Sequence, residues 1–248
     1  MENNNENLLK EYAKRYETPD FLPADPSWFM HQVAGQLNQE TMAFIASCLS
    51  YGNRKQFFPK IQYVLDCSGG NVHEWVSSGR FDADIPADDQ CYYRLYTRRT
   101  MNTFLHTLRD MIAEYGSIGE FVRSNASDGY SAVAAICRFF ATKGIEVIIP
   151  KNTQSACKRV CMFLRWMVRD NSPVDLGLWS SFIDKRTLIM PMDTHVVQQA
   201  CRLGLLTSRS GSMAAARKLT ARMSEIFPDD PLKGDFALFG YGVNKGGE

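Results

Sequence analysis

The stretch KNTQSACKRVCMFLRWMVR, residues 151–169, combines a helical pattern of apolar residues with a concentration of basic ones. Its pattern predicts a helix with Thr153 and Ser155 at its start, because their hydroxyl groups can cap exposed backbone amides. Lys158 and Arg159 then lie in the first turn, at the positive end of the helix dipole. A helix start of this kind is suited to bind a phosphate group.

Local charge favours the same interpretation. The whole chain has 28 Lys and Arg against 27 Asp and Glu, a net charge of +1, so its global charge does not indicate a polyanionic partner. Between Lys151 and Arg202, however, eight basic residues stand against four acidic ones, a local charge of +4. A solvated basic face is an equally good interpretation of this pattern alone.

A second informative stretch is LIMPMDTHVVQQACRLGLL, residues 188–206. Its apolar spacing predicts a helix over 193–203, and Asp193 is the residue that opens it. Taken alone, Asp193 is best interpreted as an N-cap, because a carboxylate at that position accepts hydrogen bonds from the first-turn amides.

Helical periodicity dominates the rest of the chain as well, and the sequence predicts an all-α fold. Residues 40–49 are apolar on nearly every side, which is typical of a helix buried in the middle of a bundle. We expect an amphipathic helix that ends before Gly116 and another helix over 212–227. The only strand-like stretch, 145–149, is too short to build a sheet.

Composition limits the class of protein. The 248 residues fit one large domain or two small lobes, and 45% hydrophobic with 22% charged residues is ordinary globular composition. Seven cysteines form no C-x-x-C pair and follow no secretory signal pattern, which predicts reduced thiols in a cytoplasmic protein. No apolar run approaches the roughly 20 residues that cross a bilayer, so we expect a soluble protein without a membrane partner.

Several common enzyme motifs are missing from the sequence. It contains no G-x-x-x-x-G-K-[ST] phosphate loop, no H-E-x-x-H helix and no G-x-S-x-G elbow. Cys157 and Cys161 share a helix face, but a metal site needs further ligands, and the four histidines do not have metal-binding spacing. We therefore interpret both as core cysteines and expect neither a metal nor another cofactor.

The two stretches together carry a resemblance. K-R-x-x-x-F-L-R is followed by a linker and then by P-x-D-T-H-V-x-x-x-x-x-R-L-G. This order resembles the helix-hairpin-helix DNA glycosylase superfamily, which includes endonuclease III and 8-oxoguanine glycosylase. In that superfamily a lysine opens the second hairpin helix and an aspartate opens the helix that follows, positions that Lys158 and Asp193 match. Over most of its length the chain also resembles an uncharacterised bacterial domain family of unknown function.

Two further stretches are similar to that superfamily. TMAFIASCLSYGNRKQFFPKI, residues 41–61, resembles its early buried helix, whose following turn enters the DNA where the base has left; here that turn carries Asn53 and Arg54. FPDDPLKGDFALFGYG, residues 227–242, resembles its last helix. The resemblance implies a base pocket near these elements, although Trp166 by its pattern is more typical of a core. The candidate pocket residues are Trp166, Asp235, Phe236 and Phe239.

Three features differ from the superfamily's pattern. Its hairpins usually contain a G-x-G turn, whereas residues 151–158 contain no glycine. Lys158 and Asp193 stand 35 positions apart, farther than in endonuclease III relatives but similar to some archaeal 8-oxoguanine enzymes. No cysteine follows Cys201, so the C-terminal four-cysteine iron–sulfur cluster of endonuclease III relatives cannot form.

The resemblance implies a two-lobed helical bundle of the helix-hairpin-helix DNA glycosylase type, with one lobe over 41–170 and the other formed by 1–40 and 171–248. It implies excision of a damaged base, with oxidised guanine a candidate, from duplex DNA, where Lys158 is the amine nucleophile and Asp193 its carboxylate partner. The missing glycines favour a non-catalytic DNA-binding relative, and the near-zero charge favours a helical protein-interaction scaffold. The candidate DNA-binding residues are Lys151, Thr153, Ser155, Arg159, Asn53 and Arg54.

Overall fold

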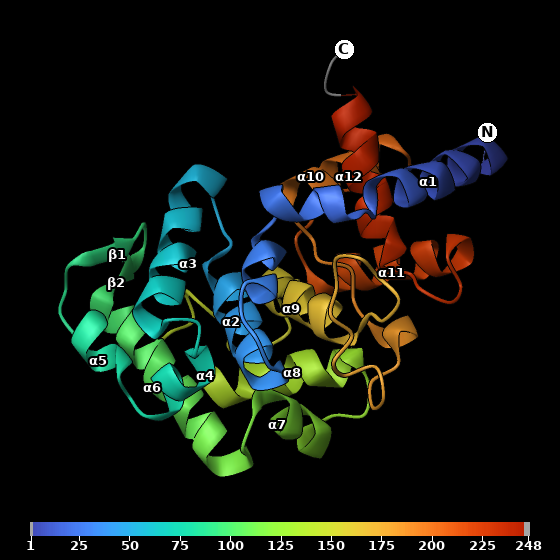
Figure 1. The fold of residues 1–248 in the computed structure, drawn as a ribbon. Coiled ribbons are helices and arrows are strands. Elements are labelled where there is room, and N and C mark those ends of the chain that lie inside the picture. Colours follow the sequence, from blue (N-terminus) through green and yellow to red (C-terminus); the bar gives the residue numbers. More distant parts are fainter. Residues whose placement is uncertain (1, 246–248) are drawn as a thin grey trace. The chain divides into compact units, whose positions relative to one another are not determined.

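The computed structural model describes residues 2–245, with side chains from 5 to 242, and its regular structure is mostly helical (Figure 1). The chain divides into two compact units. One, which we call the internal unit, holds residues 25–126 and 134–152. The other, the terminal unit, holds residues up to 24, residues 127–133 and residues from 153 onward. No helix in the described range is both long and apolar enough to cross a membrane.

The internal unit is built around one buried helix, α2 (Gln36–Leu49). Every residue of α2 from Glu40 to Leu49 is buried. This burial is possible because α2 carries apolar side chains on all of its sides. The Phe44 ring centroid lies 5.8 Å from that of Phe104 and 5.7 Å from that of Phe140. The prediction of a central core helix at 40–49 is therefore confirmed. The other elements of this unit are η2 (Pro26–His31), α3 (Arg54–Ser68), α4 (Val72–Ser77), α5 (Phe81–Asp84), β1 (Cys91–Tyr93), β2 (Tyr96–Thr97), α6 (Arg98–Tyr115), α7 (Ile118–Asn125) and the second half of α8 (Gly129–Phe140).

A short hairpin in the internal unit has no counterpart in the sequence analysis. Strands β1 and β2 pair antiparallel through Cys91 with Thr97 and Tyr93 with Tyr96. Strands of two or three residues are too short to produce a recognisable alternation of apolar and polar residues. The strand-like stretch 145–149 forms turns instead, in which the backbone N–H of Ile148 donates to the carbonyl oxygen of Ile145 at 2.8 Å.

The terminal unit joins the first and last helices of the described chain. Helix α1 (Glu2–Tyr16) packs along α12 (Lys233–Lys245), and α10 (Thr194–Arg202) also contacts α12 (Figure 1). The helices predicted over 193–203 and 212–227 are confirmed within one residue at each end. The remaining elements are η1 (Pro19–Ala24), the first half of α8, α9 (Lys158–Val168), η3 (Lys185–Thr187) and α11 (Met213–Ile226).

Helix α9 is tied to the terminal unit by the segment that precedes it. Ser155 forms an antiparallel bridge with Ser212, and the backbone N–H of Ala156 donates to the carbonyl oxygen of Gly211 at 2.9 Å. The unit boundaries therefore fall before α9, whereas the lobes expected from the sequence were 41–170 and 1–40 with 171–248. This pairing joins residues more than fifty positions apart, which local spacing does not encode.

Candidate functional site

The start of α9 differs from the helix start that the sequence predicted. The helix begins at Lys158, and its N-cap is Cys157 rather than Thr153 or Ser155. Cys157 has φ 47° and ψ 39°, a left-handed conformation that glycine adopts most easily, and no side chain caps the helix. The segment thus makes a left-handed turn directly before the first helical residue although it contains no glycine.

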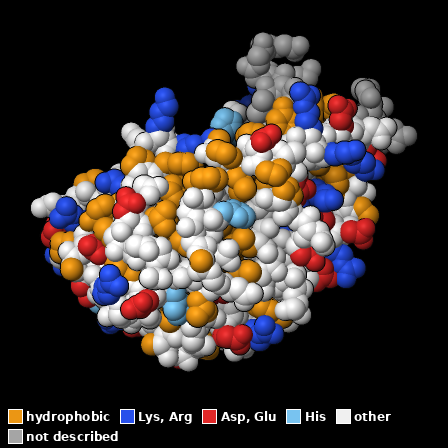
Figure 2. Space-filling view, in the orientation of Figure 1, with side chains coloured by type: hydrophobic (Ala, Val, Ile, Leu, Met, Phe, Trp, Pro, Cys, Tyr) orange, Lys and Arg blue, Asp and Glu red, His pale blue; other side chains and the backbone are white. Residues whose placement is uncertain are grey.

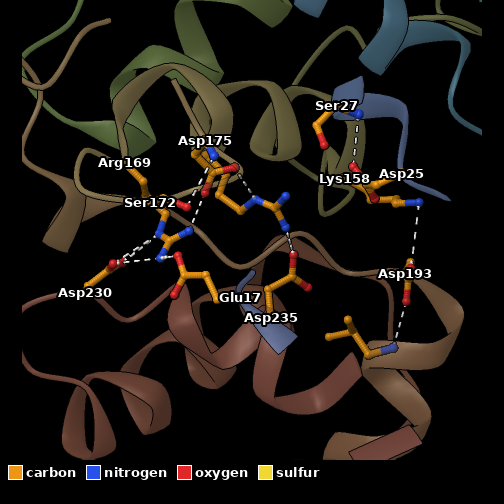
Figure 3. A network of polar contacts seen from close by, with 12 residues as sticks. Glu17, Asp25, Ser27, Lys158, Arg169, Ser172, Asp175, Asp193, Asp230 and Asp235 are labelled. Carbon is orange, nitrogen blue, oxygen red and sulfur yellow. Dashed lines mark hydrogen bonds and ion pairs between the residues drawn. The ribbon is translucent and has the colours of Figure 1, made fainter. Parts of the chain in front are cut away.

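The structure brings together the two residues predicted to be catalytic. The Lys158 Nζ lies 3.9 Å from Oδ2 of Asp193, and the two side chains are 34% and 36% exposed. Figure 3 draws this ion pair between Lys158 and Asp193. The other carboxylate oxygen of Asp193, Oδ1, accepts a hydrogen bond from the backbone N–H of Val196 at 2.7 Å. Asp193 therefore caps α10 and pairs with Lys158 at the same time, so its two interpretations are compatible.

A cation that the sequence analysis missed lies near the segment before α9. The Tyr130 hydroxyl is 3.1 Å from Oγ1 of Thr153, and the Arg217 guanidinium lies 5.3 Å from the Tyr130 ring centroid. Tyr130 comes from α8 and Arg217 from α11, so no spacing in the sequence connects them with Thr153. The surface around the predicted phosphate-binding segment therefore includes Arg217.

Two of the basic residues counted in the sequence are buried and paired with carboxylates. The Arg165 Nε lies 3.3 Å from Oδ1 of Asp175, and the Arg169 side chain also bonds to Asp175. The Arg169 Nη2 lies 2.8 Å from Asp230 and 2.6 Å from Glu17. Burial alone would lower the pKa of the Arg169 guanidinium, but the neighbouring carboxylates outweigh burial and raise that pKa. We call these paired residues the buried ion network (Figure 3). Its members are Glu17, Arg165, Arg169, Asp175, Asp230 and Asp235.

The basic surface consequently includes fewer than the eight basic residues counted between Lys151 and Arg202. Besides Arg165 and Arg169, Lys185 pairs with Asp170 at 2.5 Å and Arg186 with Asp184 at 2.6 Å. Hydrogen bonds from Lys185 and Arg186 lower the pKa of Asp170 and of Asp184, respectively. On the face drawn in Figure 2, Lys and Arg side chains are interspersed with Asp and Glu.

The predicted base-pocket residues differ in exposure. Trp166 and Phe236 are fully buried, and the Trp166 Nε1 has no hydrogen-bond partner among the described residues. The Phe236 ring lies under Arg165, with 4.8 Å from guanidinium to centroid, and Arg165 also pairs with Asp235. Phe239 is 40% exposed. Only Asp235 and Phe239 of this set present surface to solvent, so Trp166 and Phe236 lie in the core of the terminal unit.

Arg159 is the second residue of α9 in the terminal unit, whereas Asn53, Arg54 and Lys151 belong to the internal unit. Asn53 caps α3 by accepting a hydrogen bond from the backbone N–H of Lys55 at 2.9 Å. Arg54 is the first residue of α3, and both it and Lys151 are exposed. The turn before α3 is thus a helix start, and its residues 52–54 are exposed.

A cavity of about 370 Å³ lies elsewhere in the terminal unit. It is lined by Val168, Asp170 and residues 180–185, and none of the predicted site residues contributes to it. No cluster of three or more His, Cys, Asp or Glu side chains in the described part of the chain could hold a metal ion. Burial raises the pKa of the Cys161 thiol, and both Cys161 and Cys157 are buried, as expected for core cysteines.

Residues 25–244 match the model of a family described as a protein of unknown function, DUF2400. The chain belongs to this family. The match extends over residues of both units and includes α9, α10 and the β1–β2 hairpin. The Lys158–Asp193 pair therefore lies within the DUF2400 region. No curated protein and no solved structure matches the chain at a significant level.

Proposed function

We propose that this DUF2400 protein is a DNA glycosylase of the helix-hairpin-helix type with abasic-site lyase activity. The observation that carries the proposal is the 3.9 Å approach of Lys158, at the start of α9, to Asp193, at the start of α10. An amine beside a carboxylate, both partly accessible, is the arrangement that imine-forming glycosidic cleavage requires. The resemblance to 8-oxoguanine enzymes favours an oxidised guanine as the excised base.

In this mechanism the Lys158 amine attacks the anomeric carbon of the damaged nucleotide, and the base leaves with the electron pair of the glycosidic bond. The Asp193 carboxylate accepts a proton from the attacking amine and stabilises the positive charge that develops on the sugar. Opening of the sugar ring gives an imine between Lys158 and the former anomeric carbon. Loss of a proton from the neighbouring carbon then expels the 3′ phosphate, and water hydrolyses the imine to regenerate the lysine.

Borohydride trapping tests this proposal directly. Borohydride reduces an imine to a stable amine, so wild-type protein incubated with duplexes that carry an oxidised guanine or an abasic site is expected to form a covalent adduct. The adduct maps to the peptide that contains Lys158, and Lys158→Gln loses both the adduct and strand cleavage. Lys143→Gln is the matched control, because Lys143 is a half-exposed lysine that pairs with Asp110 at 3.7 Å in the internal unit.

A second candidate function is DNA binding without catalysis. The uncapped start of α9 favours it, because first-turn amides and basic side chains bind phosphate whether or not any bond is broken. In that case wild-type protein binds duplex DNA without forming an adduct, and Lys158→Gln weakens binding to every sequence by a similar factor. If the protein binds no duplex DNA, both functions are contradicted. The remaining alternative is then a helical protein-interaction scaffold.

A further inference from the structure

The cavity of about 370 Å³ in the terminal unit lies at the end of α9, where Val168 is both the last helical residue and part of the lining. Small-molecule sites of proteins are typically cavities of about 300–1,000 Å³, so a ligand of modest size fits it. Neither Lys158 nor Asp193 lines the cavity. A ligand bound there would therefore not occupy the proposed catalytic site.

The loop that forms most of the cavity is fixed to the end of α9. The backbone N–H groups of Leu176 and Gly177 donate to the carbonyl oxygen of Trp166 at 2.8 and 3.3 Å. Gly177 has φ 64°, and a Cβ on it would lie 2.8 Å from the Cα of Asp170, so this close approach requires a glycine. The lining is consequently preformed, which lowers the cost of ordering it when a ligand binds.

Every charged side chain in the lining is already paired. The Lys185 Nζ lies 2.5 Å from Oδ1 of Asp170, and Asp184 pairs with Arg186 at 2.6 Å. A charged ligand would have to displace one of these partners, whereas a neutral ligand leaves both ion pairs intact. The pairs also leave Oδ2 of Asp170 as an acceptor, because Lys185 contacts the other carboxylate oxygen. The lining therefore favours a neutral ligand with hydrogen-bond donors.

The rest of the lining combines hydroxyl groups with an aromatic ring. Ser180 and Ser181 are exposed, and among the described residues neither hydroxyl group has a hydrogen-bond partner. The Phe182 ring centroid lies 5.9 Å from that of the buried Trp179, which fixes the ring against the core. Hydroxyl groups both donate and accept hydrogen bonds, and an aromatic face packs against the apolar face of another ring.

We propose that this cavity binds a small neutral ring that carries neighbouring hydroxyl groups, as a ribonucleoside or a free sugar does. Asp170 accepts hydrogen bonds from these hydroxyl groups, as an acidic residue does from ribose in dinucleotide-binding proteins. Ser180 and Ser181 bind further polar groups of the ligand, and Phe182 packs against its ring. Deoxyribose in a DNA strand lacks such a pair of neighbouring hydroxyl groups, so this site differs from the proposed catalytic site in chemistry as well as in position.

Titration calorimetry of the full chain tests the site with two pairs of ligands, adenosine with 2′-deoxyadenosine and glucose with 2-deoxyglucose. Within the pair that binds, removal of one hydroxyl group is expected to weaken binding about tenfold. Tighter binding of adenosine identifies a ribonucleoside as the ligand, and tighter binding of glucose identifies a free sugar. Equal affinities within each pair would overturn the recognition of neighbouring hydroxyl groups. If neither adenosine nor glucose binds, the site itself is overturned.

Substitutions in the lining locate the bound ligand. The double variant Ser180→Ala with Ser181→Ala is expected to weaken binding about tenfold, because it removes two hydroxyl groups from an exposed part of the loop. Ser124→Ala is the matched control, since Ser124 is an exposed serine on α7 in the internal unit. Lys158→Gln is expected to bind these ligands as the wild type does.

Two outcomes would place the ligand elsewhere and overturn this site. One is an unchanged affinity of the double serine variant, and the other is a loss of binding in Lys158→Gln. None of these measurements involves DNA, so the failure of this site and the failure of the proposed glycosylase function are distinguishable.

Discussion

At the scale of single residues, Asp193 combines a structural contact with the catalytic role that we propose for it. Its Oδ1 accepts the Val196 amide at 2.7 Å and its Oδ2 faces Lys158 at 3.9 Å. The cap needs only an acceptor oxygen, which asparagine also provides, whereas stabilising a sugar cation and accepting a proton need the negative charge. The two tasks can therefore be separated by substitution.

We predict that Asp193→Asn lowers single-turnover base release by at least about 100-fold while the thermal unfolding midpoint changes little. Asp193→Ala serves as the control for the cap, and it is expected to lose activity and also about 1 kcal/mol of stability. Release kinetics and thermal unfolding of both variants provide the measurement. If Asp193→Asn releases base at the wild-type rate, Asp193 is only a helix cap.

At the scale of elements, the start of α9 depends on the left-handed conformation of Cys157. A glycine would adopt that conformation without steric cost, and a branched side chain would not. The absence of a G-x-G turn from residues 151–158 therefore does not exclude a hairpin-like helix start. In this chain the buried Cys157 adopts the left-handed conformation that a glycine would adopt in a G-x-G turn.

We predict that Cys157→Val destabilises the protein by about 1–2 kcal/mol and weakens duplex binding, because valine resists the left-handed region. Cys157→Gly is expected to keep the helix start and to bind DNA as the wild type does. Cys201→Val is the control, since Cys201 is a partly exposed residue with ordinary helical geometry in α10. Unfolding midpoints and DNA affinities check this prediction, and equal behaviour of the Val and Gly variants at position 157 would contradict it.

At the scale of the molecule, the buried ion network connects segments from both ends of the described chain. Arg169 bonds to Glu17, which lies 152 positions earlier, and to Asp230, which lies 61 positions later. Charges this deeply buried are tolerated only when they are paired and hydrogen-bonded. The network thus fixes the end of α9 against the residues that follow α1 and precede α12.

We predict that Arg169→Met lowers stability by about 3–5 kcal/mol, because Asp230 and Glu17 then lose their cation and Asp175 keeps only Arg165. For a chain of this size the unfolding midpoint should fall by about 10 °C. Arg222→Met is the matched control: Arg222 pairs with Glu225 at 3.1 Å on the surface, and its loss is expected to cost less than about 1 kcal/mol. Similar midpoints for the two variants would show that the network contributes no more than a surface ion pair.

The sequence by itself determined where many helices begin and end. Gly116 as the residue after α6, Asp193 as the cap of α10 and Ser212 as the cap of α11 were all predictable, because capping bonds and helical periodicity involve residues within four positions of each other. The buried position of α2 followed in the same way from its apolar composition.

Only the tertiary structure decided which basic residues are available and which residues meet. Arg165 and Arg169 had the same pattern as surface cations, yet carboxylates from distant segments bury them. The β1–β2 hairpin and the approach of Lys158 to Asp193 likewise depend on contacts between separate elements. Such contacts follow from how the helices pack. The free energy of burying a charge therefore depends on neighbours that are distant in the sequence, and not on adjacent residues in the chain.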